Sequence, residues 1–489
     1  MLFNSYDFLI FFPVVLGIYF VIPRRVQYIW LLISSYYFYM SWNPKYAILM
    51  LISTLITYLS GILIQKYKQK VKMKKLFVFS SFAINLGILF LFKYFNFVFD
   101  NMNIILNKFN IGIAIPGFDL ILPVGISFYT FQALSYTIDI YKGNIKAEYN
   151  FFRYALFVSF FPQLVAGPIE KSRDLLPQLQ ETHEFEFERV KSGLLLIVWG
   201  FIQKLIIADR LAIIVNNIYN NYTEYSGFYL IIATICFSLQ IYCDFSSYSD
   251  IAMGSAEVMG FKLSRNFHRP YFSKSISEFW RRWHITLGAW FREYLYIPLG
   301  GNRKGTIKKY RNIMIVFLAS GLWHGASWGF VIWGGLHGLY QVVGDILKPI
   351  RIKIINILNI NKRSFGYKAS QITWVFILTS FAWIFFRAPS AKIAIEIIRK
   401  IFSIDLIGLF SNKIFDLGFT TYQLFYLFIS LLCLVLVSLY RRNHSIRDFI
   451  KNQHGIFRYS IYSVVIVVLI FYWVSGQAAG DSSFIYFQF

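Results

Sequence analysis

Long apolar segments dominate the chain, separated by short stretches of polar and basic residues. The apolar segments lie at residues 8–22, 29–42, 46–64, 76–97, 193–212, 228–245, 251–261, 313–340, 374–386, 422–440 and 461–474. Their apolar residues run on without alternating, which argues against a β-barrel, and roughly 17–25 such residues suffice to span a bilayer as a helix. The pattern predicts an all-α, polytopic membrane protein with roughly 11 or more transmembrane helices.

Two stretches interrupt this helical pattern. Residues 122–129 contain a Pro123-Val124-Gly125 break, and residues 160–169 contain Pro162, Gly167 and Pro168. Non-helical backbone at membrane depth is tolerated only where protein or a water-filled cavity satisfies its polar groups. Re-entrant or broken helices are expected at both places, with ordinary loops at the membrane surface as the alternative.

A third unusual stretch, at residues 277–302, combines tryptophan with arginine. Its large apolar side chains are spaced three and four residues apart, as on one face of a helix: Trp280, Trp283, Leu287 and Trp290. This spacing predicts an amphipathic, interfacial helix at the cytoplasmic boundary. Arg281, Arg282 and Arg292 could reach phosphate oxygens, which arginine forks match well. The helix could bind the phosphates of an acyl carrier, or it could simply anchor the bundle.

Composition and charge support membrane insertion. Hydrophobic residues make up 57% of the 489 residues and charged residues 15%, while 48 Lys plus Arg against 24 Asp plus Glu give a net charge of +24. The basic residues gather at residues 24–25 and 66–75, which follow the first and third apolar segments and so lie on the same side of the membrane, whereas residues 43–45 after the second segment carry one charge. The positive-inside bias then places the N-terminus outside the cytoplasm. Anionic lipid headgroups, not nucleic acid, are the expected partners of this charge.

Some charges fall within apolar segments, where they are costly. Lys204, Asp209 and Asp244 are examples. A single charge at the bilayer centre costs about 2.5–3.5 kcal/mol on insertion scales. We expect these residues to pair within the bundle, and a role in lining a substrate path is the alternative.

The candidate chemistry centres on histidine. His284, His324 and His337 lie in apolar, aromatic-rich surroundings, and His324 is flanked by tryptophans and glycines at residues 320–328. Histidine accepts and returns a proton near neutral pH, although an apolar histidine is more often a satisfied core residue. His324 and His337 would lie some 140° apart on one straight helix. No HExxH, CxxC, Walker or GxSxG pattern occurs, so no metal and no bound cofactor are expected.

Several motifs in order resemble the membrane-bound O-acyltransferase family, in its alginate O-acetyltransferase-like branch. They are FPQLVAGPI at residues 161–169, FWRRWH at 279–284, YIPLGGNR at 296–303, GLWHG at 321–325 and FIYFQF at 484–489. The resemblance covers nearly the whole length and implies a single domain over residues 1–489, a helical bundle with a central tunnel. It also implies that His324 is the essential catalytic residue and His284 the second polar residue of the site, and it associates the position of His337 with activity.

The resemblance further implies transfer of an acetyl group across the bacterial cytoplasmic membrane. The expected donor is a cytoplasmic thioester, with acetyl-CoA as co-substrate, and the expected acceptor is a hydroxyl of an extracytoplasmic glycan, such as an exopolysaccharide or a cell-wall polymer. Transfer would be direct or relayed by an extracytoplasmic acetyltransferase partner, which the resemblance favours. His324 would remove the hydroxyl proton. The residues expected to line the donor site or tunnel are Trp280, Arg281, Arg282, Trp323 and His337.

Three other functions fit parts of the pattern. The teichoic acid D-alanyl transfer proteins share the WRRWH-type element at residues 280–284, so D-alanyl transfer is one alternative. A transporter of acyl groups or lipid would also use broken helices and a midplane histidine. A membrane scaffold for polysaccharide export is the third, and it predicts that His324 matters only for folding.

Overall fold

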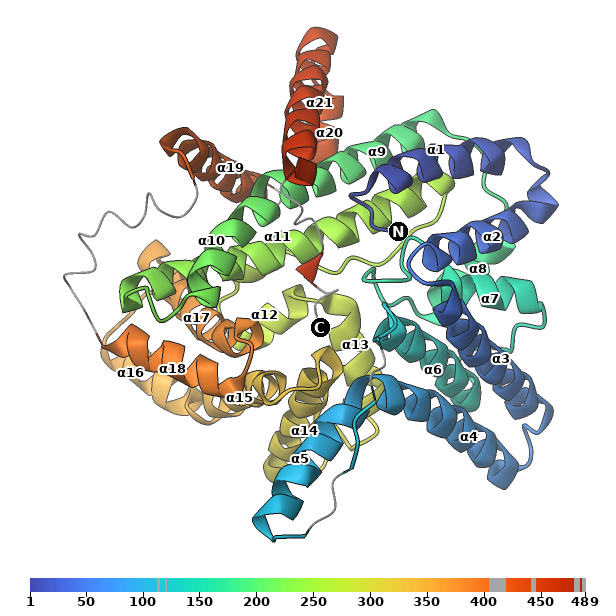
Figure 1. Cartoon of the computed structure of the whole chain (residues 1–489), viewed down its shortest axis with the longest axis horizontal. Coiled ribbons are helices and arrows are strands. Elements are labelled where there is room, and N and C mark those ends of the chain that lie inside the picture. The colour runs from blue at the N-terminus through green and yellow to red at the C-terminus, as the bar shows by residue number, and fades with distance from the viewer. Residues whose placement is uncertain (112–114, 119–120, 404–418, 441–445, 479–483, 486–489) are drawn as a thin grey trace. The chain divides into compact units, whose positions relative to one another are not determined.

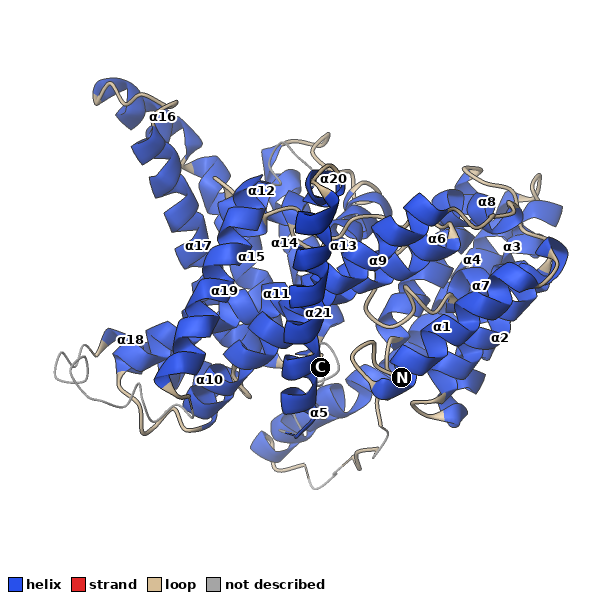
Figure 2. Ribbon diagram, turned by 90° about the horizontal axis from the view of Figure 1, so that it is seen from above, coloured by secondary structure: helices blue, strands red, loops and turns tan. Residues whose placement is uncertain are grey.

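The computed structural model describes residues 1–111, 115–118, 121–403, 419–440, 446–478 and 484–485. Over these residues the secondary structure is helical, with loops and turns but no strand (Figure 2). The predicted all-α class is confirmed. The chain divides into two compact units, residues 1–194 with 251–265 and residues 195–250 with 266–489. Whether it acts as one functional domain, as the sequence predicts, stays a prediction.

The first unit holds the N-terminal helices (Figure 1). They are α1 (Tyr6–Val21), the short 3-10 turn η1 (Arg24–Val26), α2 (Gln27–Met40), α3 (Pro44–Lys66), α4 (Val71–Leu89), the π-helical turn η2 (Phe90–Tyr94), α5 (Phe95–Lys108), α6 (Ile126–Lys142), α7 (Phe151–Ser159), α8 (Ser172–Gln180) and the start of α9 (Phe187–Phe201). Within this unit α3 packs against α4, α6 and α7, so it is the central helix.

The second unit begins within α9 and contains the remaining helices. They are η3 (Ile202–Ala208), α10 (Asp209–Asn220), most of α11 (Gly227–Met259), η4 (Pro270–Phe272), α12 (Ile276–Arg282), α13 (Ile285–Phe291), η5 (Arg292–Tyr296), α14 (Thr306–His324), α15 (Trp328–Ile346), α16 (Lys348–Ile357), α17 (Phe365–Arg387), α18 (Ala391–Phe402), α19 (Thr421–Tyr440), α20 (Ile446–Lys451) and α21 (Gly455–Ala478). Here α14 and α15 pack along each other, and α17 packs on α15.

Seven helical spans in the described residues are long and apolar enough to cross a membrane, or eight if the bent pair of α15 and α16 is one span. They are α3, α4 with α5, α9 with α10, α11, α17, α19 and α21. The chain is therefore a multi-pass membrane protein. The sequence predicts roughly 11 or more spans. Some of its segments form shorter helices, such as the 16 residues of α1 and the 14 of α2, so the full number stays a prediction.

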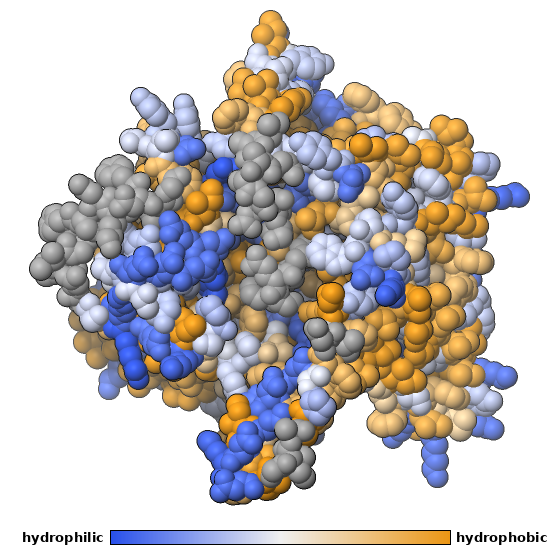
Figure 3. All heavy atoms as spheres, viewed as in Figure 1, coloured by the Kyte–Doolittle hydropathy of each residue, from blue (hydrophilic) through white to orange (hydrophobic). Residues whose placement is uncertain are grey.

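Exposed apolar side chains mark the surface of the first unit. Hydrophobic residues cover broad areas at the right of the view in Figure 3, where Figure 1 places α2, α3 and α4. Ile33 and Tyr37 on α2 and Ile48 on α3 are each more than half exposed. Apolar areas of this extent are rare on soluble monomers and suit contact with lipid tails.

Polar groups inside the first unit are hydrogen-bonded between helices. Tyr154 on α7 donates to Thr57 Oγ1 on α3 at 2.7 Å, and Ser53 on α3 donates to Asn85 Oδ1 on α4 at 2.5 Å. Such bonds tie helices together where water is scarce. They explain why polar residues recur in segments that are otherwise apolar.

The break at residues 160–169 lies inside the first unit, since every residue from 160 to 170 is buried. The backbone N–H of Phe161 donates to Ser35 Oγ at 3.1 Å, and the Gln163 amide donates to the Phe157 carbonyl at 2.9 Å. The segment is thus irregular backbone satisfied by protein, as the broken-helix interpretation requires. The start of α6 packs on it, because a Cβ at Gly125 would meet the Leu164 carbonyl oxygen at 2.8 Å.

Two predicted elements differ in the structure. The segments at 228–245 and 251–261 belong to one helix, α11. The polar residues between them stay helical because their hydroxyls find partners: Ser246 donates to Gln203 Oε1 at 2.5 Å and Ser247 to the Asp244 carbonyl at 2.6 Å. The single amphipathic helix predicted over 277–302 is wrong, because the chain breaks between α12 and α13 at Trp283 and His284.

The hairpin of α14 and α15 is held by close backbone contact. A Cβ at Gly321 would meet the Phe330 carbonyl oxygen at 2.3 Å, and one at Gly334 would meet the Phe317 carbonyl oxygen at 2.3 Å. Small residues allow this approach, as in other membrane helix pairs. The hairpin brings the end of α14 against the start of α15.

Candidate active site

His324 is the last residue of α14, and its side chain is buried at 4% exposure. Aromatic rings surround the imidazole on three sides. The ring centroids of Trp323 and Trp333 each lie 4.9 Å away at edge-on angles, and that of Phe386 on α17 lies 5.5 Å away. Three elements therefore fix the position of this histidine in the second unit.

His284 lies between α12 and α13 and is 1% exposed. Its ring meets Phe245 of α11 at 4.7 Å between centroids, and the ring of His324 is 6.5 Å away. The backbone of His284 is left-handed, with φ 43° and ψ 55°. Backbone strain of this kind gathers at functional sites. Burial lowers the pKa of His284 to about 3, so the imidazole is neutral at physiological pH.

His337 lies on α15 and is fully buried. The indole N–H of Trp280 donates to His337 Nδ1 at 3.2 Å. The Phe279 ring stacks on the imidazole, with centroids 6.2 Å apart and planes 3° from parallel. The short helix α12 thus supplies both a donor and a stacking face to this histidine.

The structure gathers five of the seven predicted site residues in one aromatic cluster of the second unit: Trp280, His284, Trp323, His324 and His337. The other two lie apart. Arg281 is exposed, and Arg282 forms an ion pair with Glu278, 2.5 Å between Nη2 and Oε1. The mutual 140° offset predicted for His324 and His337 does not apply, because they lie on separate helices that fold back on each other.

Trp333 stands at the centre of this cluster, and sequence reasoning missed it. Its ring centroid is 4.9 Å from that of His324, 5.1 Å from His337 and 5.7 Å from Trp280. Trp333 Nε1 and His337 Nε2 are buried and have no hydrogen-bond partner within the described part of the chain. Buried polar groups are normally satisfied, so an unpaired one calls for a ligand, a water or an unseen partner. The WxxxH spacing of residues 333–337 was a helical signal that could have revealed the pair.

Asn266 was also missed by sequence reasoning. It is 0% exposed and contacts three consecutive residues of the break, His284, Ile285 and Thr286. A lone asparagine 18 positions upstream in a polar loop gave no periodic signal. Only the folded chain brings it to the histidine.

Three charged residues of the second unit form a buried ion-paired group. Lys204 Nζ lies 2.9 Å from Asp209 Oδ1 and 2.7 Å from Asp244 Oδ1, which confirms the expected pairing. The backbone N–H of Ile485 donates to Asp244 Oδ2 at 2.6 Å, and Lys204 Nζ lies 4.2 Å from the Phe484 ring. These two residues begin the predicted terminal motif; residues 486–489 lie outside the described residues.

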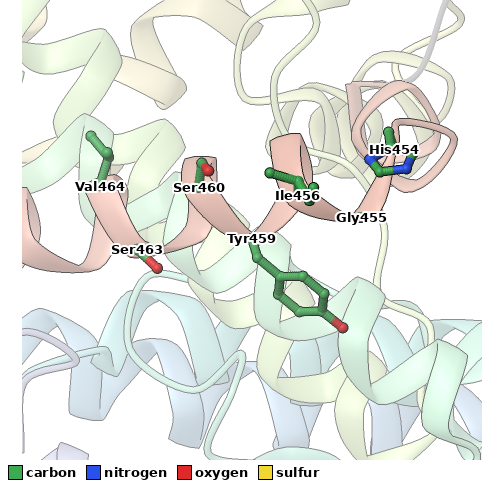
Figure 4. A pocket seen from close by; sticks show the side chains of 7 residues that line it. All are labelled: His454, Gly455, Ile456, Tyr459, Ser460, Ser463 and Val464. Atoms are coloured by element: carbon green, nitrogen blue, oxygen red, sulfur yellow. The ribbon is translucent and has the colours of Figure 1, made fainter.

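A shallow hollow follows α21 and the residue that precedes it (Figure 4). Its lining comes from one chain segment: His454, Gly455, Ile456, Tyr459, Ser460, Ser463 and Val464. It shares no residue with the histidine cluster.

Comparison with known proteins decides the family. The sequence model of the membrane-bound O-acyltransferase family matches residues 34–386. The chain belongs to this family. The match includes all three buried histidines and ends at Phe386, whose ring lies against His324. The protein is accordingly a membrane-bound O-acyltransferase, as the sequence predicts.

Curated relatives of this acyltransferase include enzymes that act on glycans. A probable alginate O-acetylase AlgI of Pseudomonas putida is 37% identical over 407 residues, which cover 82% of this chain and 80% of the relative. The peptidoglycan O-acetyltransferase of Helicobacter pylori is 34% identical and covers 78% and 75%. The teichoic acid D-alanyltransferase of Bacillus subtilis is 29% identical over 46% of this chain and 59% of the relative. The alginate O-acetyltransferase-like branch is therefore confirmed.

Proposed function

We propose that this acyltransferase moves an acetyl group from a cytoplasmic thioester, acetyl-CoA, to a hydroxyl of a polysaccharide outside the cytoplasm. The observation that carries the proposal is the packing of His324 and His284 in one buried aromatic cluster, 6.5 Å between ring centroids. The O-acetylating relatives, which cover more than three quarters of the chain, support acetyl as the group and a glycan as the acceptor.

His324 acts as general base in this proposal. Its imidazole takes the proton of the attacking hydroxyl while the oxygen bonds to the thioester carbonyl carbon. The C–S bond then breaks, and the departing thiolate takes that proton from the His324 imidazolium. General-base assistance of this kind contributes roughly 10²–10⁴-fold to the rate. The 4% exposure of His324 suits the exclusion of water, which would otherwise hydrolyse the thioester.

The unpaired donors near His324 suit the developing negative charge. In neutral His337, Nδ1 accepts from Trp280, so the ring proton is on Nε2 and that nitrogen is a donor. Trp333 Nε1 is also a donor, and both nitrogens are buried without an acceptor among the described residues. A carbonyl oxygen of the acyl group would satisfy such a donor. Donors in a site of low polarity stabilise an oxyanion more strongly than donors in water.

The donor and the acceptor of the proposed reaction lie on opposite sides of the membrane. The donor enters from the cytoplasm, and the acceptor glycan lies outside, so the acetyl group crosses the bilayer through the tunnel that the family resemblance implies. We favour relay through an extracytoplasmic acetyltransferase partner. The bacterial cytoplasmic membrane is the proposed location, with the N-terminus outside the cytoplasm by the charge bias of the loops.

D-alanyl transfer to teichoic acid is the second candidate. The Bacillus subtilis relative that bears this activity in its name supports it, although the match spans less than half of this chain. Acetyl transfer is preferred because the O-acetylating relatives match a larger share of the chain at higher identity. A transporter or a scaffold would not require the buried histidine pair.

The experiment uses the purified protein in lipid nanodiscs. Acetyl-CoA labelled in the acetyl group, and a D-alanyl thioester of a carrier protein, are offered separately with alginate or peptidoglycan fragments. Thiol release and label on the glycan are followed. The wild type should cleave acetyl-CoA. The rate of cleavage by His324→Ala should be at least about 100-fold lower, which is the lower end of a general base's contribution. Addition of the extracytoplasmic partner should be needed for label to reach the glycan.

The matched control is His454→Ala, because His454 is exposed beside α21 and far from the cluster in sequence. Both variants are compared by thermal unfolding, so that lost activity is not mistaken for lost folding. Full acetylation by His324→Ala at normal protein level contradicts the base assignment. Preference for the D-alanyl thioester favours the second candidate.

A further inference from the structure

His284 has a backbone conformation that only a few residues of the described chain share. Besides His284, the non-glycine residues with positive φ are Asn110, Arg269 and Asn359. L-residues avoid this region because Cβ approaches the following carbonyl oxygen. His284 is also buried at 1% exposure, so solvent does not stabilise the conformation. Neighbouring groups must hold it.

Asn266 supplies those groups. Its backbone carbonyl accepts the N–H of Ile285 at 2.9 Å. Its side-chain Oδ1 accepts the N–H of Thr286 at 3.2 Å and the hydroxyl of Thr286 at 2.7 Å. Asn266 Nδ2 donates to Ser249 Oγ on α11 at 3.4 Å. One asparagine thus connects the break that carries His284 to a long helix.

The same oxygen determines where the proton of His284 resides. The backbone N–H of Thr286 can only donate, so the side-chain atom that faces it must be Oδ1 and not Nδ2. Oδ1 lies 3.4 Å from His284 Nδ1 and can only accept. A lone pair on Nδ1 would face this oxygen with repulsion, so Nδ1 carries the proton. The neutral ring then has its lone pair on Nε2.

His337 shows the opposite arrangement. The Trp280 N–H donates to His337 Nδ1, so the proton of that ring is on Nε2. The two rings are therefore fixed by different neighbours as different tautomers. One presents an acceptor nitrogen at Nε2 and the other a donor nitrogen.

We propose that Asn266 is a positioning residue that holds His284 in the Nδ1–H tautomer, so that its Nε2 accepts a hydrogen bond from a donor group of the acceptor molecule other than the hydroxyl that His324 deprotonates. The chemical role rests on the proposed acyl transfer; the tautomer does not. A second histidine in such a site can orient His324, hold the acceptor, or bind the thioester oxygen. An Nε2 lone pair cannot donate to a thioester oxygen, so the last role is removed.

The decisive experiment reads the tautomer without any reaction. The full chain is labelled with ¹⁵N-histidine, reconstituted in lipid and measured by solid-state NMR, where protonated and unprotonated ring nitrogens resonate in separate regions. The difference between wild type and His284→Gln assigns the His284 signals. We expect a protonated Nδ1 and an unprotonated Nε2 at neutral pH. A protonated Nε2 on His284 would overturn the proposal while leaving acyl transfer by the protein untouched.

Asn266→Asp tests the positioning role. A carboxylate keeps the acceptor for His284 Nδ1–H and adds a negative charge that favours the imidazolium. The titration of the His284 signals should move upward by at least about one pH unit, and the acidic limb of the kcat/KM profile should follow it. A residue that only supports the fold would leave both midpoints where they are, and that result would refute the positioning role.

Asn266→Ala removes the side-chain contacts and keeps the backbone carbonyl for Ile285. We expect the His284 ring to populate both tautomers and kcat to fall about five- to tenfold, the worth of one hydrogen bond. Thr286→Val is the matched control, since it deletes one donor to Oδ1 and leaves His284 Nδ1 in contact with it. Thr286→Val should keep the wild-type tautomer. If Thr286→Val shifts the tautomer as much as Asn266→Ala does, the assignment to Asn266 is wrong. Should the Asn266 variants fail to fold, the wild-type spectrum alone still decides the tautomer.

Discussion

Close packing between α14 and α15 makes Gly321 a sensitive position. Gly321 lies three residues before His324, on the face that meets α15. A methyl group there would approach the Phe330 carbonyl oxygen to 2.3 Å, whereas ordinary contacts begin at 3.4 Å. The two helices would have to separate by about 1 Å at this point. No side-chain rotation relieves the contact, because the Phe330 oxygen belongs to the backbone and the new Cβ is bonded directly to the Gly321 backbone.

We predict that Gly321→Ala lowers stability by about 1–3 kcal/mol, the usual cost of overpacking a core. It should lower activity further, because a displacement of about 1 Å at a catalytic group can reduce the rate by about 10²-fold. The assay combines thermal unfolding in nanodiscs with cleavage of labelled acetyl-CoA. The free energy of unfolding and kcat are measured on the same preparation.

Gly335→Ala is the matched control on the same hairpin. A Cβ at Gly335 meets only a Leu318 methyl at 3.6 Å, an ordinary contact. Alanine is the better helix former, so this variant should be as stable as the wild type or slightly more stable. Wild-type activity and stability in Gly321→Ala would refute the claim that the glycine contact positions the end of α14.

Three further predictions address other parts of the chain. Lys204→Met leaves two buried carboxylates without their cation and should destabilise the protein by about 3–5 kcal/mol, while Lys392→Met, at an exposed position, should not; equal unfolding temperatures would contradict this. Burial raises the pKa of Glu170 from 4.5 to about 7, so between these values the folded state binds more protons than the unfolded state. The free energy of unfolding should therefore fall by about 3 kcal/mol as pH rises through this window, and Glu170→Gln should flatten the curve. Trp280→Phe keeps a ring beside His337 but removes its N–H donor; the loss of about 1 kcal/mol should reduce kcat about fivefold, with little change in stability.

The apolar segments, the helical class and the apolar surroundings of three histidines could be read from the sequence. Continuous apolar runs allow little besides membrane helices, and histidines amid tryptophans stand out in any such run. What the periodicity could not show was the break at Trp283 and His284. Trp280, Trp283, Leu287 and Trp290 satisfy a helical spacing perfectly well. The break comes from Asn266, which takes over the backbone donors that a continuing helix would have used.

At α11 the sequence predicts a break that the structure does not have. Serines at 246, 247 and 249 read as the end of a helix, because serine competes with the backbone for hydrogen bonds. In the structure these hydroxyls bond to partners such as Gln203 and the backbone, and the helix continues. Whether a helix ends at a polar residue or continues through it depends on side-chain partners from distant segments. A single sequence does not show which segments supply those partners.

The choice of an amide at Asn266 has a chemical consequence. A carboxylate in its place would favour the imidazolium form of His284, and a protonated ring has no lone pair with which to accept a hydrogen bond. The amide orients the ring and adds no charge, and burial then keeps the pKa of His284 near 3. Such a ring accepts a hydrogen bond without holding the proton. His324, whose ring lies 6.5 Å away between Trp323 and Trp333, takes the proton of the attacking hydroxyl. His284, as a neutral hydrogen-bond acceptor, thus holds the acceptor molecule, while His324, as a separate base, deprotonates its attacking hydroxyl.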